Sequence, residues 1–179
     1  LSHRCRPVYD DEGHFAGRRV SNRNITDRIH AQSALRKSEE RPRRIADCLR
    51  SLGLDPKENI EQITALCGRL IGADCALYNR LNREMLCSWG KWQTPASFVD
   101  EDRPEGHVCY DVIRSTGGPV RYIKNLPATG YAQSDPNVAR YGLVSYLGWR
   151  VNLTDAGIGV LCLVFQREFT PLPEHYEVL

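Results

Sequence analysis

The hydrophobic pattern predicts a domain of helices and strands between residues 53 and 179. Asp55-Pro56 favours a helix start, because Asp caps free backbone N–H groups and Pro fits the first turn. Apolar residues then recur every three or four positions up to Ile71, and Gly72 ends the helix. Strands are predicted at residues 74–81, 85–90, 119–123, 144–153 and 157–166, and further helices at 107–116 and from Thr170 onward. This order predicts an α+β fold with a central antiparallel sheet and flanking helices.

Residues 125–142 are the longest irregular stretch in this pattern. Within it, Asp135-Pro136 favours a short helix, and Gly142 ends that helix. Segments of this length are typical of lids and binding loops. We therefore expect residues 125–142, called the lid below, to cover one face of the sheet.

The sequence pattern of the first 27 residues predicts a β-hairpin. Its turn, Asp10-Asp11-Glu12-Gly13, has Gly at the position that needs a positive φ. Because two strands alone are marginally stable in water, we expect them to belong to a larger sheet. In this interpretation, residues 1–27 are the end of a preceding domain, and the chain is part of a longer protein.

The sequence of residues 28–52 is typical of a charged helix, which would link the hairpin to residues 53–179. The successive a and d positions of its heptad pattern are Leu35, Ser38, Pro42, Ile45, Leu49 and Leu52. This seam is convincingly apolar only from Ile45 onward. Because Pro42 lacks an N–H and clashes with the preceding helical turn, we expect two helices or a sharp kink near residues 40–43.

Charge and cysteine content narrow the class of protein. Residues 1–50 carry 12 Lys and Arg against 7 Asp and Glu, and the remainder carries 12 against 15. Along the linker helix, however, basic residues alternate with Glu39, Glu40 and Asp47, which indicates a solvated face and no nucleic-acid partner. The seven cysteines include no C-x-x-C motif, which favours a reduced, cytoplasmic environment. No run of about 18 apolar residues is present, so no membrane contact is expected from this segment.

Residues 43–179 resemble a GAF domain, a small-molecule-binding sensory fold. The resemblance rests on the order and spacing of several segments, which are Leu54-Asp55-Pro56, Gly72-Ala73-Asp74-Cys75-Ala76, Tyr78-Asn79-Arg80-Leu81, residues 105–113, Asn125-Leu126, Asp135-Pro136-Asn137-Val138, Tyr141-Gly142-Leu143, Ser145-Tyr146-Leu147-Gly148 and Ile158-Gly159-Val160-Leu161-Cys162. Together they are similar to the GAF domains of bacterial multi-sensor histidine kinases.

The N-terminal part resembles the end of a PAS domain, another sensory fold. Residues 9–17 look like its last hairpin, and Asn24-Ile25-Thr26 stands where that family often has Asp-Ile-Thr. Residues 34–41 look like the helix that commonly links a PAS domain to the next domain. Pro42 departs from this pattern, because such linkers usually carry an aromatic residue there.

These resemblances imply a sensory module of a bacterial signal-transduction protein. An unidentified small molecule would bind between sheet and lid, and the terminal helices would pair in a homodimer. They would relay the bound state to an output domain in the same chain, with a histidine kinase as first candidate and a cyclic-dinucleotide enzyme as second. The alternative is a ligand-free dimerisation or spacer domain, because aromatic residues on a sheet face often only fill the core. The residues expected to line the pocket are Tyr78, Trp89, Cys109, Tyr110, Tyr131, Tyr146 and Trp149.

No catalytic residue or metal ligand set is predicted, and the sequence leaves any cofactor unknown. His107 and Cys109 are the residues nearest to such a site. They form an H-x-C pair at the start of a predicted helix, which suggests either a metal site or an activated thiolate. Residues two apart on a helix do not face each other, which favours a structural role. Tetrapyrrole-binding GAF domains attach the chromophore at a Cys that is commonly followed by His, whereas Tyr110 follows Cys109.

Two further activities are known on this fold. Methionine sulfoxide reductases of this kind use paired cysteines near the pocket, for which Cys87 and Cys109 are the candidates. Such an enzyme remains a remote alternative. The Asn-Lys-Phe-Asp-Glu signature of cyclic-nucleotide-binding GAF domains is not found in order in this sequence.

Overall fold

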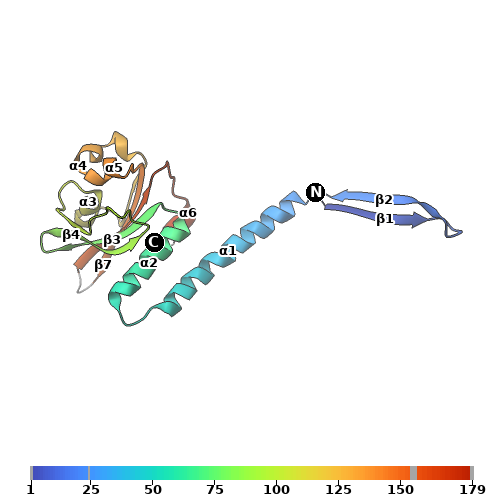
Figure 1. The fold of residues 1–179 in the computed structure, drawn as a ribbon, viewed down its shortest axis with the longest axis horizontal. Helices are drawn as coiled ribbons and strands as arrows, with labels where there is room; N and C mark the ends of the chain where they lie inside the picture. Colours follow the sequence, from blue (N-terminus) through green and yellow to red (C-terminus); the bar gives the residue numbers. More distant parts are fainter. Residues whose placement is uncertain (1, 24, 154–156, 178–179) are drawn as a thin grey trace. The chain divides into compact units, whose positions relative to one another are not determined.

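A computed structural model describes residues 2–23, 25–153 and 157–177, and only the backbone at 2–3, 21–23, 27 and 30–39. Contacts within the chain define two compact units, residues 1–44 and residues 45–179. Figure 1 labels several helices and strands of each unit. None of the described helices combines the length and apolar character that spanning a bilayer requires.

The first unit contains the predicted β-hairpin. β1 (Ser2–Tyr9) pairs antiparallel with β2 (Phe15–Arg23). At the turn, the Asp10 carboxylate accepts hydrogen bonds from the backbone N–H groups two and four positions ahead, at 3.0 and 2.8 Å. Gly13 has a φ of 84°, in the left-handed region. The hairpin is therefore confirmed, whereas its membership of a PAS domain stays a prediction.

α1 (Thr26–Ser51) is one helix that contains Pro42 in its interior. Of the two alternatives expected near residues 40–43, two separate helices is therefore wrong, and a sharp kink within one helix stays a prediction. Proline removes one backbone hydrogen bond and crowds the preceding turn, at a cost of about 3 kcal/mol. Good helix formers on both sides continue the helix across this defect, and the Pro42 ring is exposed, so it displaces no packed side chain.

The apolar seam of α1 is described only in its second half. Ile45 and Leu52 are half-buried, and Leu49 is exposed. The side chains of Leu35 and Ser38, in the first half of the predicted seam, lie outside the described residues.

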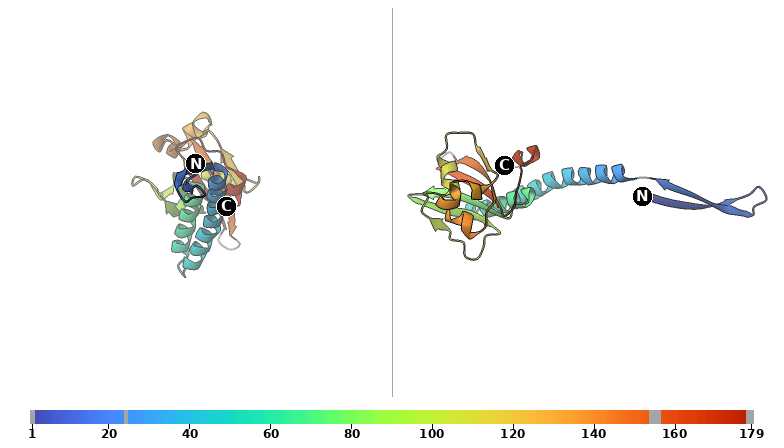
Figure 2. Two further views of the ribbon diagram at one scale, coloured as in Figure 1. Left: turned by 90° about the vertical axis from the view of Figure 1, so that its right-hand side faces the viewer. Right: turned by 90° about the horizontal axis from the view of Figure 1, so that it is seen from above.

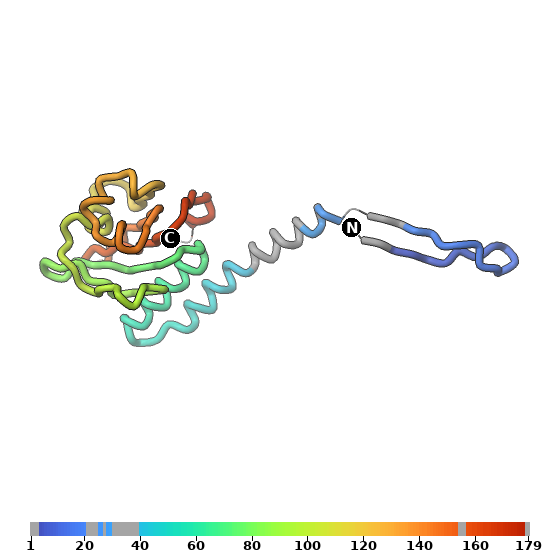
Figure 3. The backbone as a smooth tube through the Cα atoms, turned by 45° about the horizontal axis from the view of Figure 1, so that its top comes forward, coloured from blue at the N-terminus to red at the C-terminus, as the bar shows by residue number. Residues whose placement is uncertain are grey.

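α2 (Pro56–Ile71) begins and ends where the sequence predicts. The Asp55 carboxylate accepts a hydrogen bond from a backbone N–H of the first turn at 2.8 Å, and Gly72 ends the helix with a φ of 69°. Between α1 and α2 the chain reverses direction, as Figure 3 traces. There the Asn59 side chain bonds both the N–H and the C=O of Gly53 at 2.9 Å, which closes the turn.

Six strands form one antiparallel sheet in the order β5-β4-β3-β8-β7-β6. β8 lies inside the sheet, as its apolar sequence predicts, and the α+β fold with an antiparallel sheet is confirmed. The short strand β5 was not predicted, because two residues are too few to show the alternation of apolar and polar positions that indicates a strand. The strands are β3 (Cys75–Asn82), β4 (Met85–Trp92), β5 (Glu101–Asp102), β6 (Val120–Ile123), β7 (Ser145–Leu153) and β8 (Gly157–Phe165).

The two faces of the sheet are covered by different helices, as Figures 1 and 2 show. α2 packs on one face, where its Cys67 and Ile71 join a core with Leu147, Leu163 and Phe165. The other face is covered by α3 (Val108–Arg114), the 3-10 helix η1 (Leu126–Ala128), α4 (Tyr131–Ser134) and α5 (Pro136–Arg140). After β8, a short helix α6 (Pro173–Tyr176) follows.

Candidate ligand-binding pocket

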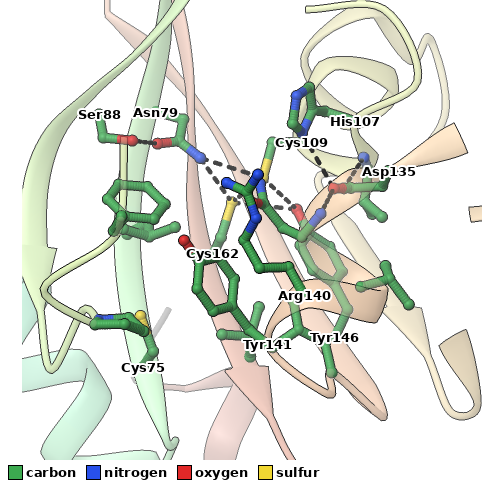
Figure 4. A pocket seen from close by; sticks show the side chains of 18 of the residues that line it. Cys75, Asn79, Ser88, His107, Cys109, Asp135, Arg140, Tyr141, Tyr146 and Cys162 are labelled. Carbon is green, nitrogen blue, oxygen red and sulfur yellow. Dashed lines mark hydrogen bonds and ion pairs between the residues drawn. The ribbon is translucent and has the colours of Figure 1, made fainter. Parts of the chain in front are cut away.

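A cavity of about 180 Å³ lies between the sheet and the segments that cover its second face. Its floor consists of residues of β3, β4, β7 and β8, and its walls come mainly from residues 93–109 and 135–143. A single water needs roughly 10–15 Å³, so the cavity has room for a small molecule. Figure 4 shows the polar residues at its centre.

Strand register decides which side chains form the floor. Successive side chains point to opposite faces of a sheet, and directly paired residues share a face. Cys75 and Tyr146 both pair with Val164, and Leu77 pairs with Cys162. All five line the cavity, so this face of β3, β7 and β8 is the one turned away from α2.

Asn79 is the centre of a buried polar cluster on this floor (Figure 4). Its Nδ2 donates to the Sγ of Cys109 at 3.2 Å, and its Oδ1 accepts a hydrogen bond from the Ser88 hydroxyl at 2.6 Å. The Tyr146 hydroxyl lies 3.2 Å from the Sγ of Cys162. An unpaired buried polar group costs about 1–3 kcal/mol, so these contacts hold each of the side chains in place.

The thiols on the cavity surface differ in acidity. Cys109 and Cys162 have their Sγ atoms 2.9 Å apart. Hydrogen bonding with Cys162, and also from Asn79, lowers the pKa of Cys109 against the opposing effect of burial. Burial raises the pKa of Cys162 well above its usual value and raises that of Cys75 to about 12. Cys109 is therefore the thiol of this group whose ionised form is most favoured.

His107 and Asp135 form a buried pair at the cavity wall. The Nδ1 of His107 lies 3.2 Å from the Oδ1 of Asp135, and the two side chains are only 6% and 8% exposed. The same carboxylate accepts hydrogen bonds from the N–H groups of Val108 at 3.1 Å and Asn137 at 3.0 Å. One side chain thus joins the first turns of α3 and α5, and His107 takes part in a structural pairing.

The hydrogen bond to Asp135 is the main reason that the pKa of His107 is raised, although burial opposes it. The nearby charges of Cys109 and Asp102 add to the increase. The carboxylate of Asp102 lies 3.5 Å from Nε2 of the imidazole. Across the described residues, no group of three or more His, Cys, Asp or Glu side chains is arranged to hold a metal ion.

Arg140, in the last turn of α5, supplies a cation at the cavity (Figure 4). Two acidic residues on the wall already have basic partners, because Asp74 pairs with Arg167 at 2.6 Å and Asp135 pairs with His107. Arg140 itself has no ion-pair partner within the described part of the chain. The third carboxylate of the lining, Asp102, lies 3.5 Å from Nε2 of His107, so the guanidinium of Arg140 is available to a ligand.

Of the seven residues expected to line a pocket, Cys109 and Tyr146 lie on the cavity surface. Tyr78 and Trp149 lie on the opposite face of the sheet, in the core beneath α2. Both belong to the other parity of their strands, since Tyr78 and Trp149 each pair with Leu161. Their bulk fills the hydrophobic core there.

The remaining three expected residues also lie away from the cavity. Trp89 is 37% exposed and stacks with Arg80, whose Cζ is 4.9 Å from the ring centroid. The Tyr110 hydroxyl accepts a hydrogen bond from Arg114 at 3.0 Å. Tyr131 donates to Asp111 at 2.7 Å. Each aromatic ring is engaged at the surface or at the edge of the core.

Sequence reasoning missed several residues that define the cavity, namely Asn79, Ser88, Arg140 and Cys162. Of these residues, Asn79 could have been identified from the sequence, because a polar side chain within a largely apolar strand requires buried partners. The pairing of Cys87 with Cys109 is replaced by that of Cys162 with Cys109. Cys87 lies between Leu86 and Ser88, which both face the cavity, so alternation turns Cys87 to the other face.

A scan of protein-family models finds no match to this sequence, and a search of curated proteins finds none either. Solved structures, in contrast, share its fold. The GAF domain of an Acinetobacter phosphoenolpyruvate-protein phosphotransferase aligns with a TM-score of 0.61 and 11% identity, over 79% of this chain and 84% of that one. The phycocyanobilin-bound GAF domain of a cyanobacterial phytochrome aligns with a TM-score of 0.55 and 14% identity, over 79% and 86%.

A third structure is the GAF domain of a putative sensor histidine kinase from Pseudomonas syringae pv. tomato. It aligns with a TM-score of 0.50 and 12% identity, over 86% of this chain and 85% of that one. At such low identities these likenesses establish the fold. The GAF-like fold expected from the sequence is confirmed.

Proposed function

We propose that residues 45–179 are the sensory module of a signalling protein and bind a small molecule in the cavity between sheet and lid. The observation that carries this proposal is the cavity itself, which combines apolar walls with a few convergent polar groups. Small-molecule sites commonly have this composition. The GAF-like fold supports a sensory, regulatory role, since sensor kinases and phytochromes are among the proteins with similar structures.

The lining indicates the chemistry of the ligand. Leu77, Leu86, Phe98, Val99 and Leu143 supply apolar contacts. Arg140 supplies a charge without an ion-pair partner among the described residues, and a guanidinium binds carboxylate or phosphate groups in a forked geometry. We infer a small, partly apolar molecule that carries one anionic group.

The test is a thermal-shift screen of the purified chain against carboxylate- and phosphate-containing metabolites, with native mass spectrometry for retained ligand. A ligand at a hundred times its Kd stabilises the folded state by about 2.7 kcal/mol, which gives a measurable rise in Tm. Arg140→Gln is expected to lose most of that rise. Arg69→Gln is the matched control, because Arg69 lies in the last turn of α2 on the opposite face of the sheet.

The sensory proposal fails if no retained mass is found and no metabolite shifts the Tm. The remaining function would then be the alternative, a dimerisation or spacer domain without a ligand. Loss of the shift in both Arg140→Gln and Arg69→Gln would instead reject the role of Arg140, because a general charge effect would then explain the binding.

The proposal includes relay to an output domain through a helical homodimer. Ile45, Leu49 and Leu52 keep heptad spacing, and Leu49 is 61% exposed in the single chain, which supports pairing of α1 with a second copy. A histidine kinase is the first candidate for the output domain. Light scattering after size exclusion tests the dimer, with Leu49→Glu expected to shift it toward monomer. A monomeric wild-type chain at high concentration would contradict the pairing.

A further inference from the structure

Cys109 and Cys162 bring two thiols into contact at the floor of the cavity, although they are 53 positions apart in the chain. Their Sγ atoms are 2.9 Å apart, within about 1 Å of the 2.05 Å length of a disulfide bond. Cys109 belongs to the first turn of α3, and Cys162 belongs to β8 in the interior of the sheet. Both sulfurs are therefore held by packed elements.

We propose that Cys109 and Cys162 are a site of reversible oxidation, at which a small hydroperoxide converts the two thiols into a disulfide. This proposal concerns the thiol pair alone and does not depend on the anionic ligand proposed above. Disulfides in reducing compartments are usually transient and redox-sensing or catalytic, which fits a pair that lies free in this structure.

The surroundings assign different roles to the two sulfurs. The Sγ of Cys109 accepts a hydrogen bond from the Nδ2 of Asn79 at 3.2 Å and lies 3.8 Å from the Tyr146 hydroxyl. Such donors stabilise a thiolate, in agreement with the lowered pKa of Cys109. Cys162 is fully buried and stays protonated, because burial raises its pKa. Cys109 is thus the attacking sulfur and Cys162 the resolving one.

The chemistry proceeds in two balanced steps. The Cys109 thiol releases its proton, and the thiolate attacks the terminal oxygen of the hydroperoxide, so that an S–O bond forms and the O–O bond breaks. The alkoxide or hydroxide that leaves takes up the proton released by Cys109 and departs as alcohol or water. Cys162 sulfur then attacks the Cys109 sulfenic acid, so that the S–S bond forms and the S–O bond breaks. The displaced hydroxide leaves as water with the Cys162 proton. An external dithiol reverses the reaction by thiol–disulfide exchange.

A small oxidant has access to this pair from the cavity. Cys109 and Cys162 both line the cavity, and Cys109 keeps partial exposure. Other lining residues, among them Gln93, Val99 and Arg140, are exposed to solvent. The cavity therefore connects the thiol pair with the surface.

Two other cysteines provide internal controls. Cys75 lines the same cavity, but its pKa of about 12 keeps it protonated, so it does not compete with Cys109 for the hydroperoxide. The 2.9 Å sulfur contact that resolution of the sulfenic acid requires belongs to Cys162. Cys5 is exposed in the first unit and reports general oxidation by the reagent. A reaction specific to the proposed site must therefore oxidise Cys109 in preference to Cys75 and Cys5.

The experiment treats the reduced full chain with hydrogen peroxide, blocks remaining thiols by alkylation and maps the peptides by mass spectrometry. We expect one cross-linked peptide pair that contains Cys109 and Cys162, with a loss of two hydrogens, and its disappearance after dithiothreitol. Cys75→Ser should keep the cross-link. Cys162→Ser should lose it and accumulate a sulfenic acid on Cys109 that dimedone traps.

Peptide mapping of the wild-type chain decides the proposal even if a variant does not fold. Oxidation of Cys5 while Cys109 and Cys162 remain alkylatable after denaturation would overturn it. A dominant cross-link between Cys75 and Cys109 would overturn the assignment of Cys162 as the resolving thiol. Circular dichroism before treatment identifies variants that are folded.

Discussion

The imidazole of His107 pairs with the carboxylate of Asp135 at an Nδ1–Oδ1 distance of 3.2 Å, and that carboxylate also accepts hydrogen bonds from the first turns of α3 and α5. A single buried interaction thus connects two helices at the cavity wall through a titratable group whose pKa is raised by the hydrogen bond to Asp135. Protonation of His107 therefore strengthens the contact that joins these two helices.

Stability is expected to fall as pH rises through the raised pKa of His107. The hydrogen bond to Asp135 is the first cause of that increase, so the folded chain binds the proton more tightly than the unfolded chain. The resulting stabilisation is complete below the unfolded pKa of about 6.5 and is lost as pH rises through the folded value. Urea unfolding on both sides of this range measures the effect.

His107→Gln is the control for this pH dependence, because it removes the titrating group while keeping a polar side chain. Its unfolding free energy should depend less on pH above about 6.5 than that of the wild type. Parallel pH profiles for the two proteins would show that other groups control the change.

Asp135→Ala is expected to lower the unfolding free energy by about 3–5 kcal/mol, because it removes the buried partner of His107, leaves only the exposed Asp102 carboxylate beside the imidazole and removes a helix cap. Asp55→Ala is the matched control, since Asp55 caps α2 at an exposed position. Its expected cost is about 1 kcal/mol. Equal costs measured by urea denaturation would indicate that the His107 pair adds nothing beyond capping.

Gly148→Ala is expected to destabilise the floor of the cavity. A Cβ at Gly148 would lie 2.5 Å from the hydroxyl oxygen of Tyr146, and such overpacking costs about 1–3 kcal/mol. Gly118→Ala is the control, because a Cβ there meets no atom within 4 Å. In a double-mutant cycle with Tyr146→Leu, most of the Gly148→Ala cost should disappear. Additive costs would exclude the ring of Tyr146 as the cause.

Pro42→Ala is expected to stabilise α1 locally by about 3 kcal/mol, because alanine restores a helical N–H and removes the clash one turn back. Pro42 is exposed, so the substitution leaves no cavity. Hydrogen exchange of the backbone amides around residue 42 measures the change. Unchanged protection would mean that the helix already compensates for the proline.

Local sequence patterns were sufficient to predict most helices and strands of residues 45–179. Asp55 and Gly72 predict the ends of α2 because a helix end is satisfied by residues within one or two turns. Pro42 shows the limit of such rules, since the helix formers around it outweigh a local penalty. β5 shows another limit, because a strand of two residues is defined only by its pairing with β4 and not by its own sequence.

The cavity depends on interactions that no local pattern contains. Tyr146 and Trp149 are three positions apart on one strand, so they must lie on opposite faces. Only the packing of α2 on one face and of α3 and α5 on the other decides which ring meets the cavity. Cys109 and Cys162 meet only because α3 packs on β8. Patterns along the chain are short-ranged, whereas a site assembled from distant segments forms only when the sheet acquires its register and its covering helices.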